Sequence, residues 1–119
     1  MSKQDAREQA LGLLYAVDLG PDSEAVEPTG RAGRLSTGVQ EHLSEIDTEI
    51  DAHSTGWRIT RMPAVDRTIL RIAVYELMYT DTPVGVVVSE AVELAKRYST
   101  AKSGSFVNGV LSSVAADRG

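Results

Sequence analysis

Residues 63–78 read Pro-Ala-Val-Asp-Arg-Thr-Ile-Leu-Arg-Ile-Ala-Val-Tyr-Glu-Leu-Met. Proline suits the first turn of a helix, because the amide hydrogen that it lacks would have no partner there. After this proline, apolar residues recur at helical spacing and cover well over half of the helix circumference. They are Val65, Ile69, Leu70, Ile72, Ala73, Val74, Leu77 and Met78. A helix that is apolar on so many sides needs neighbours around it, so this stretch predicts a central helix in an all-α fold.

Two further helices are predicted before this stretch. Residues 5–19 place Ala6, Ala10 and Leu14 on one face, with Asp5 as the N-cap. Residues 35–57 carry a longer apolar stripe that steps by three, four and seven residues, with acidic residues on the opposite face, and this helix is predicted to end near Ser54-Thr55-Gly56. The members of the stripe are Leu35, Val39, His42, Leu43, Ile46, Ile50, His53 and Trp57. Between the two helices, the segment Gly20–Gly33 is rich in glycine and proline and is interpreted as a loop.

Two more helices are predicted after the central one. Residues 84–98 follow helical spacing, and the strand propensity of Val86-Val87-Val88 is outweighed because one strand has no partner here. The last helix is expected to be capped by Ser103, with Gly109 allowing close packing. We therefore expect two packed helical subdomains, a reduced N-terminal one in residues 1–60 and a three-helix one in residues 61–119, hinged around residues 60–63.

Composition limits the classes of function. The chain has 119 residues, with 12 Lys and Arg against 17 Asp and Glu, for a net charge of −5. This balance argues against coating nucleic acid by bulk charge, so any such site must be a local basic patch. The absence of cysteine excludes disulfides, thiolate zinc sites and a cysteine nucleophile. No apolar run is long enough to span a bilayer, which predicts a cytoplasmic protein with no membrane contact.

The sequence shows no constellation for catalysis. His42 and His53 lack the spacing that brings two imidazoles to one metal ion, so no metal site is assigned. The Ser99-x-x-Lys102 match stands alone, without the companion motifs of acylating enzymes. A glycine-rich phosphate loop is also missing. We expect no catalytic residue and no cofactor.

A cluster of cations and aromatic residues surrounds the polar loop at residues 99–105. It consists of Lys96, Arg97, Tyr98, Lys102 and Phe106. Cations neutralise phosphates and aromatic faces stack unpaired bases, which is how single-stranded RNA is usually held. The alternative is that the aromatic residues face the core and the cations complement a helix dipole.

Four blocks of the sequence resemble the NusB family of bacterial transcription antitermination factors. They are Ala6-Arg7-Glu8-x-Ala10-Leu11-x-x-Leu14-Tyr15, residues 63–77, Glu90-Ala91-Val92-Glu93-Leu94-Ala95-Lys96 and Phe106-Val107-Asn108-Gly109-Val110-Leu111. The blocks occur in the right order and cover nearly the whole chain. The resemblance implies two packed three-helix bundles, of which the N-terminal one is pruned here by the short Gly20–Gly33 segment.

The resemblance also implies a non-enzymatic RNA-binding protein. Family members pair with NusE, a ribosomal small-subunit protein, and the pair binds boxA RNA of nascent ribosomal transcripts and keeps RNA polymerase processive. The RNA-binding positions that we assign are Lys3, Arg7, Tyr15, Lys102, Ser103 and Phe106, with Lys96 added from the cationic cluster. Asp66 matches an acidic position that faces the basic partner NusE.

Three other interpretations remain open. The arm Lys3-Gln4-Asp5-Ala6-Arg7 has few cations for this family, so the chain could be an adaptor that binds protein and not RNA. The same domain occurs fused to ribosomal RNA cytosine methyltransferases, and 119 residues leave no room for such an enzyme unless the chain is a fragment. A pruned N-terminal bundle would also leave the stripe of residues 35–57 short of cover, for which a homodimer is one solution.

Overall fold

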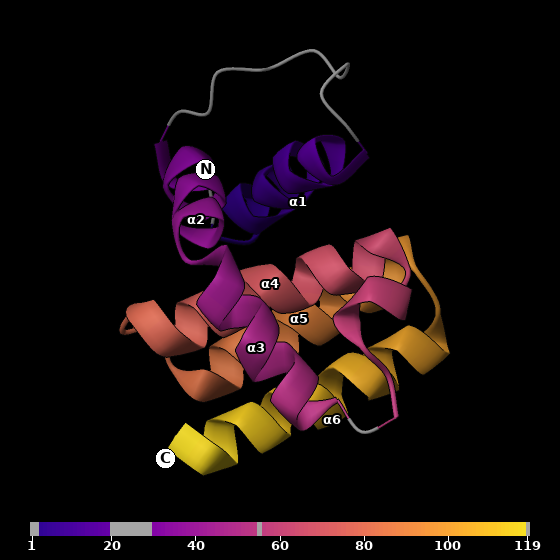
Figure 1. Cartoon of the computed structure of the whole chain (residues 1–119). Coiled ribbons are helices and arrows are strands. Elements are labelled where there is room, and N and C mark those ends of the chain that lie inside the picture. The colour runs from indigo at the N-terminus through magenta and orange to yellow at the C-terminus, as the bar shows by residue number, and fades with distance from the viewer. Residues whose placement is uncertain (1–2, 20–29, 55, 119) are drawn as a thin grey trace.

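The computed structural model describes residues 3–19, 30–54 and 56–118, and in the first helix the side chains of residues 6–15. This part of the chain is all-α, as predicted, and contains no strand. Its helices are α1 (Lys3–Leu19), α2 (Gly30–Glu41), α3 (Leu43–His53), α4 (Ala64–Tyr79), α5 (Val84–Tyr98) and α6 (Ala101–Arg118), with the short 3-10 helix η1 (Ile59–Arg61) before α4. Figure 1 shows α1 and α2 on one side of α4 and α5, and α6 on the other. None of the described helices is long and apolar enough to cross a bilayer.

Helix α4 is the centre of the molecule, as its apolar circumference predicted. It packs against each of the other five α-helices that the structure describes. Ile69, Leu70 and Val74 on α4 are at most 1% exposed. Helix α3 packs on α4 and α6, and more lightly on α2. The division into subdomains at residue 60 stays a prediction.

The prediction of one unbroken helix from residue 35 to about residues 54–56 is wrong, because the chain bends at His42. The predicted end agrees with the structure, in which α3 ends at His53. This residue has φ −114° and ψ 20°, and its ring stacks on Tyr79 with the centroids 4.1 Å apart. The bend leaves much of the stripe in the core. Two members before it, Leu35 and Val39, and two after it, Ile46 and Ile50, are at most 8% exposed. This part of the stripe is thus covered within the chain. Leu43 and Trp57 are exceptions, since Leu43 is 36% exposed and Trp57, which follows the end of α3, is 54% exposed.

Several predicted boundaries also differ. Helix α2 begins at Gly30, so Gly30–Gly33 are helical, and the rest of the predicted loop lies outside the described residues. Asp5 lies within α1 and is not its N-cap. Helix α6 begins before Ser103, and the capping hydroxyl belongs to Thr100, whose Oγ1 accepts a hydrogen bond from the Ser103 amide at 3.1 Å.

The glycine that permits close packing is Gly38, not Gly109. A Cβ added at Gly109 would meet no atom of the described residues within 4 Å, so none of them packs closely against that backbone. A Cβ added at Gly38 would lie 2.3 Å from Cζ of Tyr75. The absence of a side chain at Gly38 therefore lets the ring of Tyr75 on α4 lie directly against α2.

Candidate nucleic-acid and partner interface

The link between α3 and α4 is held by hydrogen bonds at several points. The amide of Ile59 donates to Oδ1 of Asp51 at 2.7 Å, and the hydroxyl of Ser54 donates to the carbonyl of Trp57 at 2.7 Å. Nη1 of Arg67 donates to the carbonyl of Met62 at 3.2 Å. These bonds hold the described backbone next to Trp57, whose indole is exposed.

A pocket of about 230 Å³ opens beside this link. It is lined by Trp57, Met62, Pro63, Asp66, Lys102, Ser103 and Phe106. The link and the first turn of α4 form one wall, and the start of α6 forms the other. Four of the residues assigned from the sequence thus meet at one place, although Asp66 was assigned to the protein partner and the other three to RNA. We call this cavity the Trp57 pocket.

Asp66 is the buried acid of the Trp57 pocket. The residue is 4% exposed, and its Oδ2 accepts a hydrogen bond from the hydroxyl of Ser103 at 2.8 Å. Its Oδ1 is buried and has no hydrogen-bond partner among the described residues. A buried carboxylate oxygen without a partner is unfavourable by roughly 1–3 kcal/mol or more, because it has lost its water and gained nothing in exchange.

Arg7 is also buried, at 4% exposed, and its charge is matched inside the protein. Its Nε and Nη2 donate to the two carboxylate oxygens of Glu76, each at 2.7 Å. The hydrogen bonds to Glu76 raise the pKa of the Arg7 guanidinium above its ordinary value, against the opposing effect of desolvation. Charge-assisted bidentate pairs of this kind are among the strongest polar contacts in proteins.

The Arg7–Glu76 pair forms part of a second pocket, of about 380 Å³. Its lining residues are Arg7, Arg31, Arg34, Leu35, Tyr75, Glu76, Thr80 and Thr82. Arg31 and Arg34 on α2 are exposed. Arg7 thus forms part of the wall of this pocket.

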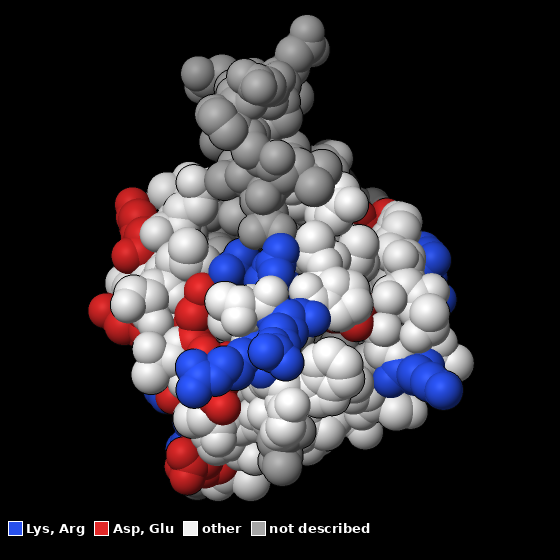
Figure 2. Space-filling model, turned by 45° about the vertical axis from the view of Figure 1, so that its right-hand side comes forward, with Lys and Arg blue, Asp and Glu red and all other residues white. Residues whose placement is uncertain are grey.

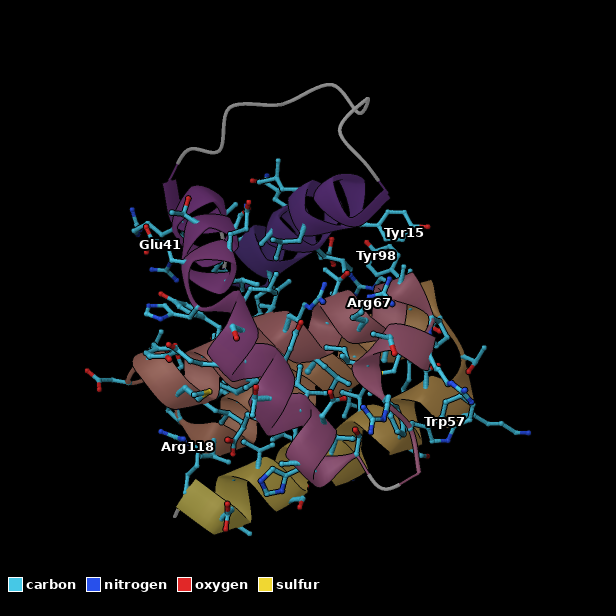
Figure 3. All side chains as sticks on the ribbon, in the orientation of Figure 1. Tyr15, Glu41, Trp57, Arg67, Tyr98 and Arg118 are labelled. Atoms are coloured by element: carbon cyan, nitrogen blue, oxygen red, sulfur yellow. The ribbon has the colours of Figure 1, made fainter. Side chains whose placement is uncertain are left out.

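The remaining predicted RNA positions lie as follows. Lys96 and Lys102 are exposed, Tyr15 and Phe106 are half-buried, and the side chain of Lys3 lies outside the described residues. In Figure 3, Tyr15, Tyr98 and Trp57 lie toward one edge of the molecule, and Glu41 and Arg118 lie toward the opposite edge. Figure 2 shows the molecule turned so that the first edge comes forward, with Lys and Arg side chains across the middle and most acidic ones along one side. The acidic chain thus has a local group of cations, as required for contact with phosphates.

The cationic cluster around residues 96–106 is only partly available to a ligand. A Cβ at Gly104 would lie 3.1 Å from Cγ of Lys96, so the stem of Lys96 lies against the start of α6. The guanidinium of Arg97 is paired with Glu8 on α1 and with Glu93 one turn earlier. The charge of Glu8 is the main cause that raises the pKa of Arg97. Lys102 is therefore better placed than Arg97 to meet an incoming anion.

His53 links α3 to α6 at a separate place. Its Nδ1 lies 2.7 Å from Oγ of Ser113, and its Nε2 lies 3.3 Å from Glu49 and 3.4 Å from Asp117. One ligand atom from each of Glu49, His53 and Asp117 lies within 4.8 Å of the others, a spacing that a metal ion could bridge. The prediction of no metal site stays a prediction.

Sequence reasoning missed Trp57 and the two arginines of α2. The sequence pattern places Trp57 on the buried stripe because it follows the stripe's spacing of seven residues, although the helix is predicted to end before it, near Ser54-Thr55-Gly56. Arg31 falls in the segment interpreted as a loop. Only a helix over residues 30–41 places Arg31 and Arg34, three residues apart, on the same face.

Comparison with known proteins assigns the chain to a family. The model of the NusB family matches residues 4–116. The chain belongs to the NusB family. Among curated relatives, the transcription antitermination protein NusB of Geobacillus kaustophilus is 46% identical, with 98% of this chain and 97% of the relative covered. NusB of Anaeromyxobacter dehalogenans strain 2CP-1 is 45% identical, with 92% of this chain and 87% of the relative covered.

The solved structures that are similar to this chain also include NusB proteins. NusB from T. maritima superposes with a TM-score of 0.87 and 33% identity, covering 98% of this chain and 92% of that one. A structure of the antitermination factors NusB and NusE in complex with dsRNA gives a TM-score of 0.80 and 30% identity, covering 97% of this chain and 96% of that one. The resemblance stated from the four sequence blocks is thereby confirmed.

Proposed function

We propose that this NusB-family chain is an RNA-binding transcription antitermination factor that pairs with NusE. In this proposal the pair binds boxA RNA of nascent ribosomal transcripts and acts on the transcribing RNA polymerase complex. The observation that carries the proposal is the Trp57 pocket, because it joins the partner position Asp66 to the RNA positions Lys102, Ser103 and Phe106. The similarity to NusB in a complex with NusE and RNA supports the same assignment.

The exposed cations and half-buried aromatic residues suit a single RNA strand. Lys102 and Lys96 are available for phosphates, and Tyr15 and Phe106 keep part of their rings open to a base. Lys3 stays in the proposal as the remaining cation of the N-terminal arm. Arg7 acts from the floor of the second pocket, with its guanidinium held by Glu76.

The mechanism is composite, because the chain itself is acidic. With a net charge of −5, RNA is held by a few local contacts only, and a basic partner docked beside them extends the positive surface. We expect the affinity for boxA RNA to rise strongly when NusE is added. Equal affinity with and without NusE, measured at two salt concentrations, would reject the composite mechanism.

Charge reversal at Lys102 tests the RNA site directly. Lys102→Glu should weaken RNA binding without weakening NusE binding, and should reduce the magnitude of the slope of log affinity against log salt by about 0.7 for the phosphate contact that is lost. Arg118→Glu is the matched control, since Arg118 is an exposed cation toward the opposite edge of the molecule. Equal losses of RNA affinity in both variants would mean that general charge, and not this site, holds the RNA.

The adaptor interpretation has one observation in its favour, namely that Arg7 is already engaged with Glu76. An adaptor would bind NusE and leave boxA RNA free in a mobility-shift assay with both present. The antitermination factor proposed here would shift the RNA. The homodimer stays a prediction, and most of the stripe that motivated it is covered by α4 and its neighbours.

A further inference from the structure

The unpaired oxygen of Asp66 indicates that the Trp57 pocket receives a donor from outside the chain. The carboxylate is 4% exposed, and only its Oδ2 is hydrogen-bonded. A carboxylate that is merely structural would be expected to have both oxygens bonded, because an unpaired buried acceptor destabilises the fold. Asp66 also lines a cavity, so a group that enters the cavity lies next to this carboxylate.

The chemistry of the pocket indicates which kind of hydrogen-bond donor would bind next to Asp66. Trp57, Met62, Pro63 and Phe106 make most of the wall apolar, with the acid as its only charged group apart from Lys102, which is exposed. A neutral nucleobase would supply a hydrogen bond to Asp66 and leave its charge uncompensated in this surrounding. A lysine ammonium would supply the charge, but it is strongly hydrated and gains little from apolar walls.

A guanidinium supplies the positive charge and the hydrogen bond, and it also tolerates apolar walls. It is positively charged, planar and weakly hydrated, and it donates several hydrogen bonds in a fixed geometry to a carboxylate. It also stacks on an indole, for which the 54% exposed side chain of Trp57 offers a free surface. We propose that the Trp57 pocket binds one arginine side chain of NusE, which donates to Asp66 Oδ1 and stacks on Trp57.

This inference rests on the proposed pairing with NusE and adds to it the residue type and the place of contact. It also gives Trp57 a role that the sequence did not indicate. Lys102 and Phe106 line the same pocket, so the arginine would lie at the border between the partner and the RNA strand. Docking of NusE would then fix one wall of the RNA site, which accounts for the composite mechanism in structural terms.

The single tryptophan of the chain gives a direct reporter. Labelling with 5-fluorotryptophan yields one fluorine signal, at Trp57, which can be followed by NMR on the full chain. We expect NusE alone to shift this signal and boxA RNA alone to leave it nearly unchanged. A shift of similar size with RNA alone, and none with NusE, would assign the pocket to a nucleobase and overturn the proposal.

Two variants measure the contribution of the pocket to NusE binding. Asp66→Asn keeps the shape of the side chain and removes its charge, and should weaken NusE binding by about 30-fold or more. Trp57→Leu removes the stacking surface and should weaken it by about fivefold. Tyr79→Leu is the matched control for loss of an exposed aromatic ring, because it lies at the other end of α4, about 20 Å along the helix from Asp66.

Arginine-to-lysine substitution along NusE identifies the inserted side chain. One such substitution should reproduce the loss seen with Asp66→Asn, and combining the two should cause little further loss, as expected for residues in contact. Unchanged NusE affinity in both Asp66→Asn and Trp57→Leu would overturn the pocket assignment while the proposed function stands. Failure of the unmodified chain to bind NusE at all would instead reject the proposed pairing, and the inference with it.

Discussion

Helix α4 carries two buried carboxylates that differ in how they are satisfied. Glu76, near the C-terminal end of the helix, is 3% exposed and receives one hydrogen bond from Arg7 on each oxygen. Asp66, in the first turn, is 4% exposed, and only its Oδ2 is hydrogen-bonded, to a neutral hydroxyl. Burial is therefore the same for both residues, and the number and charge of their partners is different.

The difference distinguishes a carboxylate that joins two helices, Glu76, from one that is proposed to bind a partner, Asp66. The Glu76 charge is balanced inside the chain, and the pair joins α1 to α4. The Asp66 charge is left to be balanced from outside, at a pocket with an exposed indole on its wall. A buried acid is thus informative about binding only when the partners of each oxygen are known.

Loss of Arg7 should have the largest effect on stability. Arg7→Ala leaves the Glu76 carboxylate buried without its cation, so we expect a decrease of about 3–5 kcal/mol in the free energy of unfolding, measured by urea denaturation. The double variant Arg7→Met with Glu76→Leu is the control. It should recover most of the loss, because two apolar side chains of similar size need no charge compensation. A double variant as unstable as Arg7→Ala would show that packing, and not the unpaired charge, causes the loss.

Removal of the Ser103 hydroxyl should have an intermediate effect. Ser103→Ala takes away the hydrogen bond at 2.8 Å to Asp66 Oδ2, and we expect a decrease of about 1–3 kcal/mol in the free energy of unfolding. Ser112→Ala on the exposed side of α6 is the matched control and should change stability by less than about 0.5 kcal/mol. Equal stability of Ser103→Ala and the unmodified chain would mean that Asp66 is stabilised by something other than this hydroxyl.

Neutralising Asp66 should have a smaller effect on the free chain. The Asp66→Asn side chain still presents an oxygen to Ser103, and it removes the uncompensated charge, so we expect a change of less than about 1 kcal/mol in the free energy of unfolding. Thermal denaturation without NusE measures it. A large loss of stability would show that the Asp66 charge already has a partner within the chain and would weaken its contrast with Glu76.

Protonation of the exposed Glu45 carboxylate should affect only its contacts with Tyr79 and His42. The hydroxyl of Tyr79 donates to Oε2 of Glu45 at 2.7 Å, and this bond, with a lesser one from His42, lowers the pKa of Glu45. A lowered pKa in the folded state means that the stabilisation is present above the unfolded-state pKa and is lost as the pH falls through the folded-state value. Tyr79→Phe should raise the pKa of Glu45 toward its ordinary value, as followed by NMR titration of its carboxyl group. An unchanged pKa would assign the shift to His42 instead.

Periodicity was enough to predict the helices that are amphipathic or apolar along their length. The central position of α4 followed from its circumference, and α5 was correctly preferred over a strand at Val86–Val88. The bend at His42 could not be predicted, because the stripe has the same spacing on both sides of it. The bend is accompanied by the stacking of His42 on Tyr79, a contact between residues that are distant in the sequence.

The candidate site was predictable in its residue types and not in their arrangement. The family resemblance gave Asp66, Lys102, Ser103 and Phe106, and the structure brings them to one pocket. The ion pair of Arg7 with Glu76 depends on the packing of α1 against α4, so nothing near Arg7 in the sequence indicates its burial. The same holds for the exposure of Trp57, which depends on where α3 ends.

The central position of α4 also has a consequence for how the molecule opens. Every other α-helix in the described part of the chain packs against α4. None of them can therefore separate from α4 without exposing apolar surface of α4 to water. The amide protons of Ile69, Leu70 and Val74 should therefore exchange with solvent at the rate set by global unfolding. Each of the two sites on α4 would then be lost in the same cooperative event, whichever of them is perturbed first.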